Sequence, residues 1–442
     1  MELLITICQI IDMNVGYILH CVGKFSDPIL PPPLLNPCIQ ILSDSQTYFM
    51  NHKTTLSLAA LGLVSSLALM ACGGSDSNAA PTATTTTTTA ATVWPPVPTL
   101  IAHRGASALR PEHTLAAYTQ AIEDGADIIE PDLVATKDGV LVARHENAIA
   151  ILNADGTIRE ATTDIATRAE FAGLLTTKTI DGTAIRGWFT EDMTLAQLKT
   201  LRAVERIPAI RPANVAFNGQ FQVPTLQEVI DLAKSKSIEK GRTIGIYPET
   251  KHPTYFKSIG LPLERRLIDV LAANGWNSKD APVFIQSFEV ANLKEMRALT
   301  TVRITQLLSS SGRPFDFVAA GAGETRSYAD LITPAGLREV ATYANGIGPS
   351  KDMVIPVVSG ALGTPSALVT NAKAANLLTH IYTLRPENNF LPASLKKAPV
   401  TDNTVRGDSI TEIQTFLQAG VDGFFTDDSA VGRTAIRTFV KK

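Results

Sequence analysis

Short apolar runs alternate with longer amphipathic stretches from residue 98 onward in this 442-residue chain, and this alternation constrains the fold most. Apolar runs bounded by turn residues predict buried strands, whereas amphipathic stretches predict helices. Repeated strand and helix units of this number predict a TIM-type (β/α)8 barrel. The predicted strands are 99–103, 127–132, 140–144, 243–248, 283–287, 303–308, 378–384 and 423–426, and the predicted helices are 114–124, 225–236, 262–274, 290–299, 334–344, 363–376, 409–419 and 429–440.

One of these strands conflicts with a regular barrel. Only about seven residues join the strands at 127–132 and 140–144, whereas parallel neighbours require a crossover of about a dozen or more. The apolar residues at 347–349 supply a further candidate strand. Nine candidates therefore compete for eight places, and one of them is expected to be wrong.

Five ionisable side chains lie where predicted strands end. His103 and Arg104 follow the first strand, Glu130 and Asp132 end the second, and His145 follows the third candidate. In parallel α/β folds, ligand sites lie at the carboxyl ends of the strands. Glu130 and Asp132 are two positions apart, so on an extended strand their side chains share one face, about 7 Å apart along the chain.

The order of short motifs resembles the glycerophosphodiester phosphodiesterase family, in its secreted or periplasmic branch. The first group is HRGAS at 103–107, PEHT at 111–114, the Glu130 and Asp132 pair, TKDG at 136–139 and the following histidine. IGIYPETK at 244–251, QSF at 286–288, HIYTLR at 380–385 and GVDGFFTD at 420–427 continue the series. The resemblance covers roughly residues 98–442, and by implication this region is the catalytic domain.

The resemblance implies a divalent metal on Glu130, Asp132 and Glu249, and an acid and base pair formed by His103 and His145. The chemistry of the residues agrees. Hard cations prefer oxygen ligands, so three carboxylates without a nearby cysteine favour Ca²⁺ or Mg²⁺ over thiolate-bound zinc. Histidine suits proton transfer because its pKa lies near neutrality.

Further residues are expected around the substrate. Arg104 and Lys251 either neutralise the phosphate or hold the carboxylates in place as ion-pair partners. Glu112 either contacts substrate or shapes the start of the following helix. Pocket walls are expected from the aromatic residues at strand ends, which are Phe288, Tyr382 and Phe425.

Two local features depart from the family's common pattern. Glu146 follows the second histidine where many members have aspartate, and REATTD at 159–164 replaces a more usual arginine followed by two threonines. A long segment, about 150–240, is predicted to be an insertion at the catalytic face after the third strand, because ordinary loops are much shorter. By resemblance it caps the active site on the glycerol side; the alternative is a structural flap without ligand contact.

The segment 50–72 has the pattern of a bacterial lipoprotein signal peptide. A basic start after Met50, an apolar stretch and a lipobox ending at Cys72 predict lipidation of that cysteine. The alternative is a transmembrane anchor of about minimum length. Met50 is interpreted as the true start, with 1–49 translated from upstream sequence or forming a genuine extension.

A linker and a cell-envelope location follow from the next segment. Residues 73–97 are rich in Thr, Ser and Ala and predict a flexible tether between membrane and catalytic domain. Gly73 after the lipidated cysteine favours the outer membrane, facing the periplasm or the surface. All four cysteines lie at or before Cys72, so no disulfide is expected in the catalytic domain. A net charge of −3 excludes the basic field that nucleic-acid binding requires.

The predicted function is metal-dependent hydrolysis of glycerophosphodiesters, such as glycerophosphocholine, to sn-glycerol 3-phosphate and an alcohol. A small-molecule substrate and a membrane held through the Cys72 lipid are the expected partners, and the sequence indicates no oligomeric state. The nucleophile stays open between water and the substrate's own glycerol hydroxyl. Alternatives are a phospholipase C or D-like enzyme on the same barrel and a non-catalytic surface lipoprotein that binds a ligand.

Overall fold

The computed structural model describes residues 9–13, 16–20 and 94–441. The chain divides into two units, 1–85 and 86–442, which are described separately. In the first, β1 (Gln9–Met13) and β2 (Gly16–His20) form an antiparallel hairpin. The predicted signal peptide, Cys72 and most of the predicted linker lie outside the described residues.

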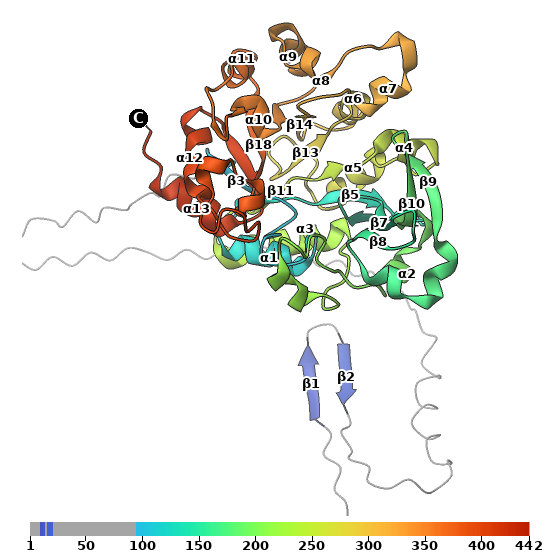
Figure 1. Ribbon diagram of the computed structural model, residues 1–442. Coiled ribbons are helices and arrows are strands. Elements are labelled where there is room, and N and C mark those ends of the chain that lie inside the picture. Colours follow the sequence, from blue (N-terminus) through green and yellow to red (C-terminus); the bar gives the residue numbers. More distant parts are fainter. Residues whose placement is uncertain (1–8, 14–15, 21–93, 442) are drawn as a thin grey trace, which may run out of the picture. The chain divides into compact units, whose positions relative to one another are not determined.

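The strand pairing of the second unit makes a barrel of eight parallel strands, which confirms the predicted fold. Figure 1 shows helices packed around these strands. Two of the eight are each divided into two pieces, β4 with β5 and β11 with β12. Parallel pairing runs from each strand to the next, and β19 pairs with β3 to complete the circle. The strands are β3 (Thr99–Ala102), β4 (Ile128–Ile129), β5 (Asp132–Ala135), β11 (Gly245–Ile246), β12 (Glu249–Thr250), β13 (Phe284–Ser287), β14 (Arg303–Leu308), β15 (Gly346–Pro349), β18 (Leu378–Leu384) and β19 (Gly423–Thr426).

Eight helices follow the eight barrel strands, and all eight predicted helices are confirmed. Local signals set their ends: the Thr114 hydroxyl accepts from the Ala117 N–H where the first helix begins, and Thr225 with Glu228 forms a capping box at the next. These helices are α1 (Leu115–Glu123), α3 (Leu226–Lys240), α5 (Glu264–Ala273), α6 (Val290–Leu299), α9 (Pro334–Val340), α11 (Leu368–Ala374), α12 (Ser409–Gln418) and α13 (Ser429–Thr438).

Shorter elements lie in the connections. They are α2 (Leu195–Leu198), α4 (Pro253–Ser258), α7 (Phe315–Ala319), α8 (Tyr328–Leu331), α10 (Lys351–Val354) and a small hairpin of β16 (Val357–Val358) and β17 (Ala361–Leu362). Among the described residues, every helix is too short or too polar to cross a membrane.

The structure corrects one of the nine candidate strands. The segment predicted at 140–144 forms β6 (Leu141–Ala143), which pairs antiparallel with β5, while the candidate at 347–349 is the barrel strand β15. The short TKDG connection makes a tight turn, and a tight turn returns the chain antiparallel. The insertion therefore follows the second barrel strand and not the third.

The insertion contains a four-stranded antiparallel sheet that the sequence reasoning missed. Its strands are β7 (Ala148–Leu152), β8 (Ile158–Ala161), β9 (Thr176–Ile180) and β10 (Thr183–Phe189), in the order β8-β7-β10-β9. The insertion also holds the short helix predicted at 194–202, found as α2, and it ends before α3, which belongs to the barrel. The sheet lies beside α4 in Figure 1. Tyr255 of α4 packs against the apolar cluster that the sheet forms from Ala148, Ile151, Ile180 and Phe189.

Aromatic side chains fill the barrel interior beneath the catalytic end. Tyr247 stacks on Phe284 at a centroid distance of 4.9 Å and meets Phe425 edge-on at 5.1 Å. Trp94 packs on Phe284 from the residues just before β3. This interior cluster, with Ile101 and Ile128, is separate from the larger core between strands and helices. The site above it therefore rests on a filled and rigid floor.

Candidate active site

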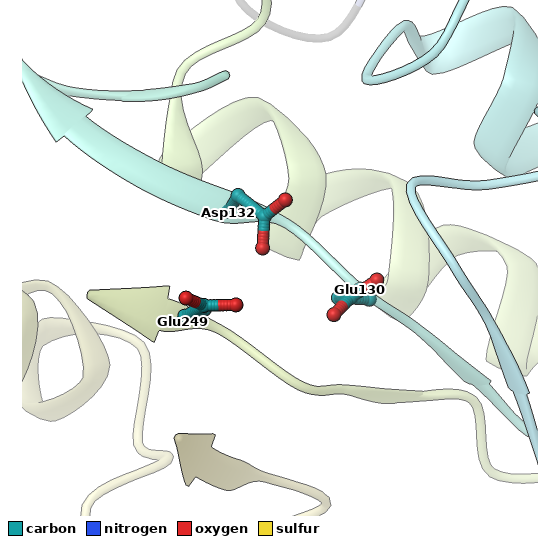
Figure 2. Close-up of side chains that lie close together, drawn as sticks. All are labelled: Glu130, Asp132 and Glu249. Carbon is teal, nitrogen blue, oxygen red and sulfur yellow. The ribbon is translucent and has the colours of Figure 1, made fainter. Parts of the chain in front are cut away.

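The three predicted metal ligands converge at the carboxyl ends of neighbouring strands. Glu130 and Asp132 lie on either side of the break between β4 and β5, and Glu249 opens β12, paired in register with Asp132. One ligand oxygen from each lies within 4.8 Å of the others. Figure 2 shows the three carboxylates gathered around one space. All three are buried, with exposures of 3%, 1% and 6%.

A proline accompanies each of the two strand breaks. Pro131 stands between Glu130 and Asp132, and Pro248 directly precedes Glu249. Proline has no N–H for the strand ladder, so it interrupts a central strand. Glu130 consequently lies in a break, while Asp132 and Glu249 open the strand pieces that follow the two breaks.

The residues at this site fit a divalent cation. The Oδ1 atom of Asp132 is buried and has no hydrogen-bond partner. Burial raises the pKa of Glu249 to about 7, Lys251 offsets part of this rise, and Asp132 adds to it. Burial and the neighbouring Asp132 and Glu249 also hold the pKa of Glu130 well above its usual range. A hard cation would satisfy the free oxygen and relieve the repulsion among the three carboxylates.

His103 is oriented by a carboxylate from the last barrel strand. Its Nδ1 lies 2.5 Å from Asp427 Oδ1, and Asp427 in turn binds Arg211 and Arg385. Burial opposes ionisation of Asp427, but these two arginines keep the pKa of its carboxyl well below its usual value. Burial and Arg104 lower the pKa of His103 to about 4. At neutral pH the neutral ring donates from Nδ1 to Asp427, which leaves Nε2 unprotonated.

His145 has a matching arrangement, although it follows β6 and not a barrel strand. Its Nδ1 lies 2.8 Å from Glu146 Oε1, and its Nε2 lies 3.3 Å from Lys251 Nζ. Burial, Arg104 and Lys251 lower the pKa of the His145 imidazole to about 3. Glu146, the residue that departs from the family pattern, thus orients the second histidine through its Nδ1.

A second ion-pair chain reaches Glu146 from the insertion. His252 Nε2 lies 2.7 Å from Glu146 Oε2, and its Nδ1 lies 2.6 Å from Asp181 Oδ2 in the turn between β9 and β10. Burial opposes protonation, but the bonds to Asp181 and Glu146 raise the pKa of His252 to about 9. His252 is therefore a cation that donates to both carboxylates, and it links the insertion sheet to His145.

Arg104 and Lys251 are ion-paired with the carboxylates in this structure. The Arg104 N–H donates to Glu130 Oε2 at 3.0 Å, and its guanidinium binds both oxygens of Glu112. Lys251 Nζ lies 2.9 Å from Glu249 Oε1. Both side chains thus form the ion pairs that were predicted as the alternative to phosphate binding. Their contact with phosphate and that of Glu112 with substrate stay predictions.

Left-handed backbone conformations cluster at this site. Arg104, His113 and His252 have φ values of 58°, 53° and 48°. Residues other than glycine adopt this region at a cost, and such residues concentrate at functional sites. His113 is fully buried, and its Nε2 lies 2.9 Å from Asp132 Oδ2. It therefore holds the Asp132 carboxylate by Oδ2 and leaves Oδ1 without a partner.

A pocket of about 130 Å³ lies over the triad. Of the predicted aromatic walls, Tyr382 and Phe425 line this pocket, whereas Phe288 lines a neighbouring one. The residues around it are His103, Arg104, Glu130, Asp132, His145, Glu249, Gln286, Leu307, Tyr382, Thr383, Arg385 and Phe425. The structure thus brings both histidines, all three carboxylates and Arg104 to one cavity.

Several residues of the site were missed by sequence reasoning. Asp427, Arg385 and Gln286 each belong to a motif already singled out at a strand end, so their position was a usable signal. Gln286 Nε2 donates to Glu130 Oε1 at 2.8 Å. Arg211 and Asp181 come from the insertion, where no pattern in the sequence points to them.

Fold and site together define a class of protein, a TIM-barrel enzyme with two carboxylate-oriented histidines beside a buried carboxylate triad. Comparison with known proteins then identifies the family. The model of the glycerophosphoryl diester phosphodiesterase family matches residues 103–431. The chain belongs to this family.

Individual relatives agree with this assignment. Glycerophosphodiester phosphodiesterase GDPD6 of Arabidopsis thaliana is 34% identical over 342 residues, which cover 75% of this chain and 83% of the relative. A glycerophosphodiester phosphodiesterase of Haemophilus influenzae is 26% identical over 75% of this chain and 88% of its own length. The crystal structure of a putative glycerophosphoryl diester phosphodiesterase from Silicibacter pomeroyi has a TM-score of 0.52 at 19% identity, covering 78% of this chain and 96% of that one, which bears on the fold alone.

Proposed function

We propose that this enzyme hydrolyses glycerophosphodiesters, such as glycerophosphocholine, to sn-glycerol 3-phosphate and the free alcohol, with a divalent cation and two histidines. Membership of the family supports the reaction. The observation that carries the mechanism is the single pocket that holds the carboxylate triad and both histidines. Glu130, Asp132 and Glu249 would hold Ca²⁺ or Mg²⁺, which supplies positive charge beside the phosphate when bound.

The two histidines transfer the protons. Each is held by a carboxylate at Nδ1, which leaves Nε2 for chemistry, and in His145 this atom lies 3.3 Å from Lys251 Nζ. One ring takes a proton from the attacking water or glycerol hydroxyl, and the other gives a proton to the leaving alcohol. A bound phosphodiester is anionic, and a nearby negative charge raises the pKa of an imidazole, so substrate binding favours the protonated ring that the leaving group needs.

Arg104 and Lys251 complete the charge balance around the phosphate. Both lie beside the triad and already carry a carboxylate partner. Their donors therefore stay positioned at the catalytic pocket, where they stabilise charge that develops on the phosphate oxygens. Water and the substrate's glycerol hydroxyl are both compatible with this arrangement. Detection of a cyclic glycerol phosphate intermediate would select the second route.

The test is release of sn-glycerol 3-phosphate from glycerophosphocholine, measured with calcium, with magnesium and with a chelator. We expect release that the chelator abolishes and that one of the two cations restores. Release that persists after chelation would refute the role of the cation. Cleavage of diacyl phospholipid in preference to the deacylated compound would instead support the phospholipase alternative, and ligand binding without turnover would support the binding-module alternative.

We further propose that the enzyme is a lipoprotein of the cell envelope, with its catalytic domain tethered to the outer membrane through Cys72. The lipobox before that cysteine and the Thr-rich residues that follow support this location. A Cys72→Ser variant should lose labelling by radioactive palmitate and leave the membrane fraction, while the released enzyme still cleaves soluble substrate. Labelling that survives this substitution would contradict the proposal.

A further inference from the structure

A second, larger pocket adjoins the catalytic one. It measures about 400 Å³ against about 130 Å³, and Glu249 lines both pockets. The glycerol phosphate part of a glycerophosphodiester is constant, whereas the esterified alcohol varies. A neighbouring cavity that opens from the reaction centre is therefore suited to the variable part of the substrate.

Aromatic rings form a continuous wall between the two pockets. Tyr382, which lines the catalytic pocket, meets Phe288 edge-on at a centroid distance of 5.9 Å, and Phe288 meets Tyr328 edge-on at 6.2 Å. Phe288, Tyr328 and Phe315 all line the larger pocket. The faces of such rings attract cationic groups, and most strongly when water is excluded.

Glu289 is a buried carboxylate of this pocket without a cationic partner among the described residues. It is 4% exposed, and it forms no ion pair. Its oxygens accept bonds from the N–H and hydroxyl of Thr254 at the start of α4. Although Glu289 stands directly before α6, its side chain makes no capping bond there. Burial raises the pKa of Glu289 to about 7, so its charge gains from a cation placed beside it.

The positively charged side chains of the pocket are already engaged. Lys251 pairs with Glu249, and His252 pairs with Glu146 and Asp181. Arg313 has no carboxylate partner, but its guanidinium donates to the main-chain carbonyls of residues 317, 324 and 326. Glu289 is thus the charge that remains available to an incoming cationic group.

We infer that this pocket binds the alcohol part of the substrate and that Glu289, with the aromatic wall of Phe288 and Tyr328, selects alcohols that carry an ammonium group. This inference rests on the proposed function and deepens it. It assigns the choline and ethanolamine diesters as favoured substrates over diesters of an uncharged alcohol such as glycerol.

The test compares kcat/KM for glycerophosphocholine, glycerophosphoethanolamine and glycerophosphoglycerol in the full-length enzyme with its cation. In Glu289→Gln we expect the ratio of glycerophosphocholine to glycerophosphoglycerol to fall about tenfold, mainly through KM, because one charge-assisted contact is lost. Tyr328→Leu should lower the same ratio, and more for choline than for ethanolamine, since the larger ammonium depends more on the ring face.

Two controls separate recognition from structure. Thr254→Ala removes the hydroxyl that bonds Glu289 but keeps the main-chain N–H bonds and the charge of Glu289. Arg313→Gln removes the pocket's arginine. Both variants should preserve the substrate ratio. Equal losses on all three substrates in Glu289→Gln would overturn the inference and make Glu289 a structural residue. Failure of the unsubstituted enzyme to cleave any of the three would instead refute the proposed function.

Discussion

The three carboxylates of the site share a chemical type but not an environment. Asp132 accepts a bond from buried His113, which, against the effect of burial, keeps the pKa of its carboxyl well below the usual value. Glu249 and Glu130 have raised pKa values instead. Asp132 is thus ionised at neutral pH, whereas burial and mutual repulsion oppose ionisation of Glu130 and Glu249. This arrangement is expected of a site that a cation completes.

Two variants distinguish the proposed proton-transfer role of His145 from the proposed metal-ligand role of Asp132. His145→Ala should lower kcat by about 10²–10⁴-fold, because a general acid or base contributes this much. Cation affinity should stay nearly unchanged, since His145 is not a ligand. Asp132→Ala should lose both turnover and cation binding. Calorimetric titration with calcium and magnesium measures the binding, and unchanged affinity in Asp132→Ala would make the ligand assignment wrong.

Cation binding should strengthen as the pH rises through 7. The pKa of Glu249 is raised from 4.5 to about 7, so in the cation-free enzyme its contribution to stability is full below 4.5 and is lost as the pH rises through 7. A cation binds the ionised carboxylate, so below pH 7 it must displace a proton, and apparent affinity falls about tenfold per pH unit. The melting temperature of the enzyme should rise more at pH 8 than at pH 6 when the same concentration of the cation is added. Equal gains at both values would contradict this account.

The insertion contacts the partners of both histidines. Asp181, between β9 and β10, holds His252, and His252 holds the glutamate that orients His145. Arg206 and Arg211 from the same insertion bind Glu112 and Asp427. The insertion is thus linked to His145 through Asp181, His252 and Glu146, and to His103 through Arg211 and Asp427. The cap over the glycerol side and the structural flap without ligand contact both stay predictions.

A substitution far from the reacting atoms tests this coupling. Asp181→Asn removes the charge that holds His252, so we expect kcat to fall about tenfold with little change in KM, as for other residues that support a catalytic group. Asp155→Asn is the matched control, because it lies in the exposed turn between β7 and β8 of the same sheet. Steady-state kinetics on glycerophosphocholine gives the comparison, and similar activity in the two variants would exclude the coupling.

The elements also show why some parts of the fold were predictable from sequence and others were not. Five of the barrel helices, α1, α3, α9, α12 and α13, begin at a side-chain cap, and amphipathic stretches predicted all eight from local signals. The strands of the insertion lack this: β9 reads TTKTI and is largely exposed, without the apolar alternation that marks a strand. β6 was misplaced because an apolar run of three residues reads the same in a barrel strand and in a hairpin.

At the scale of the whole molecule, the barrel depends on its aromatic interior and not on covalent links. All cysteines lie at or before position 72, and the described residues of the catalytic unit contain none. Phe284 is fully buried and contacts Trp94 and Tyr247 within the barrel. The convergence of the triad from strands more than a hundred residues apart depends on this closed barrel. Sequence reasoning reached it through strand ends, but it could not reach partners contributed by loops.

Removing the central ring should destabilise the whole unit. Phe284→Ala should lower the free energy of unfolding by about 3–5 kcal/mol, because a cavity remains where a large buried side chain was. Phe221→Ala is the matched control in the insertion, where the ring is only partly buried. Urea unfolding followed by tryptophan fluorescence measures both, and equal losses would show that the interior cluster is not the main support.

The prolines at the two strand breaks have a consequence for how such an enzyme can change over generations. Each proline stands beside a ligand, since Glu130 precedes Pro131 and Glu249 follows Pro248, and the strand pieces on both sides of each break pair in parallel. Because proline donates no N–H to the ladder, the pieces on the two sides of a break pair separately, and a substitution above the break need not shift the register below it. The barrel below the breaks and the catalytic end above them can therefore change in sequence separately. Substrate preference can then change without loss of the folded barrel.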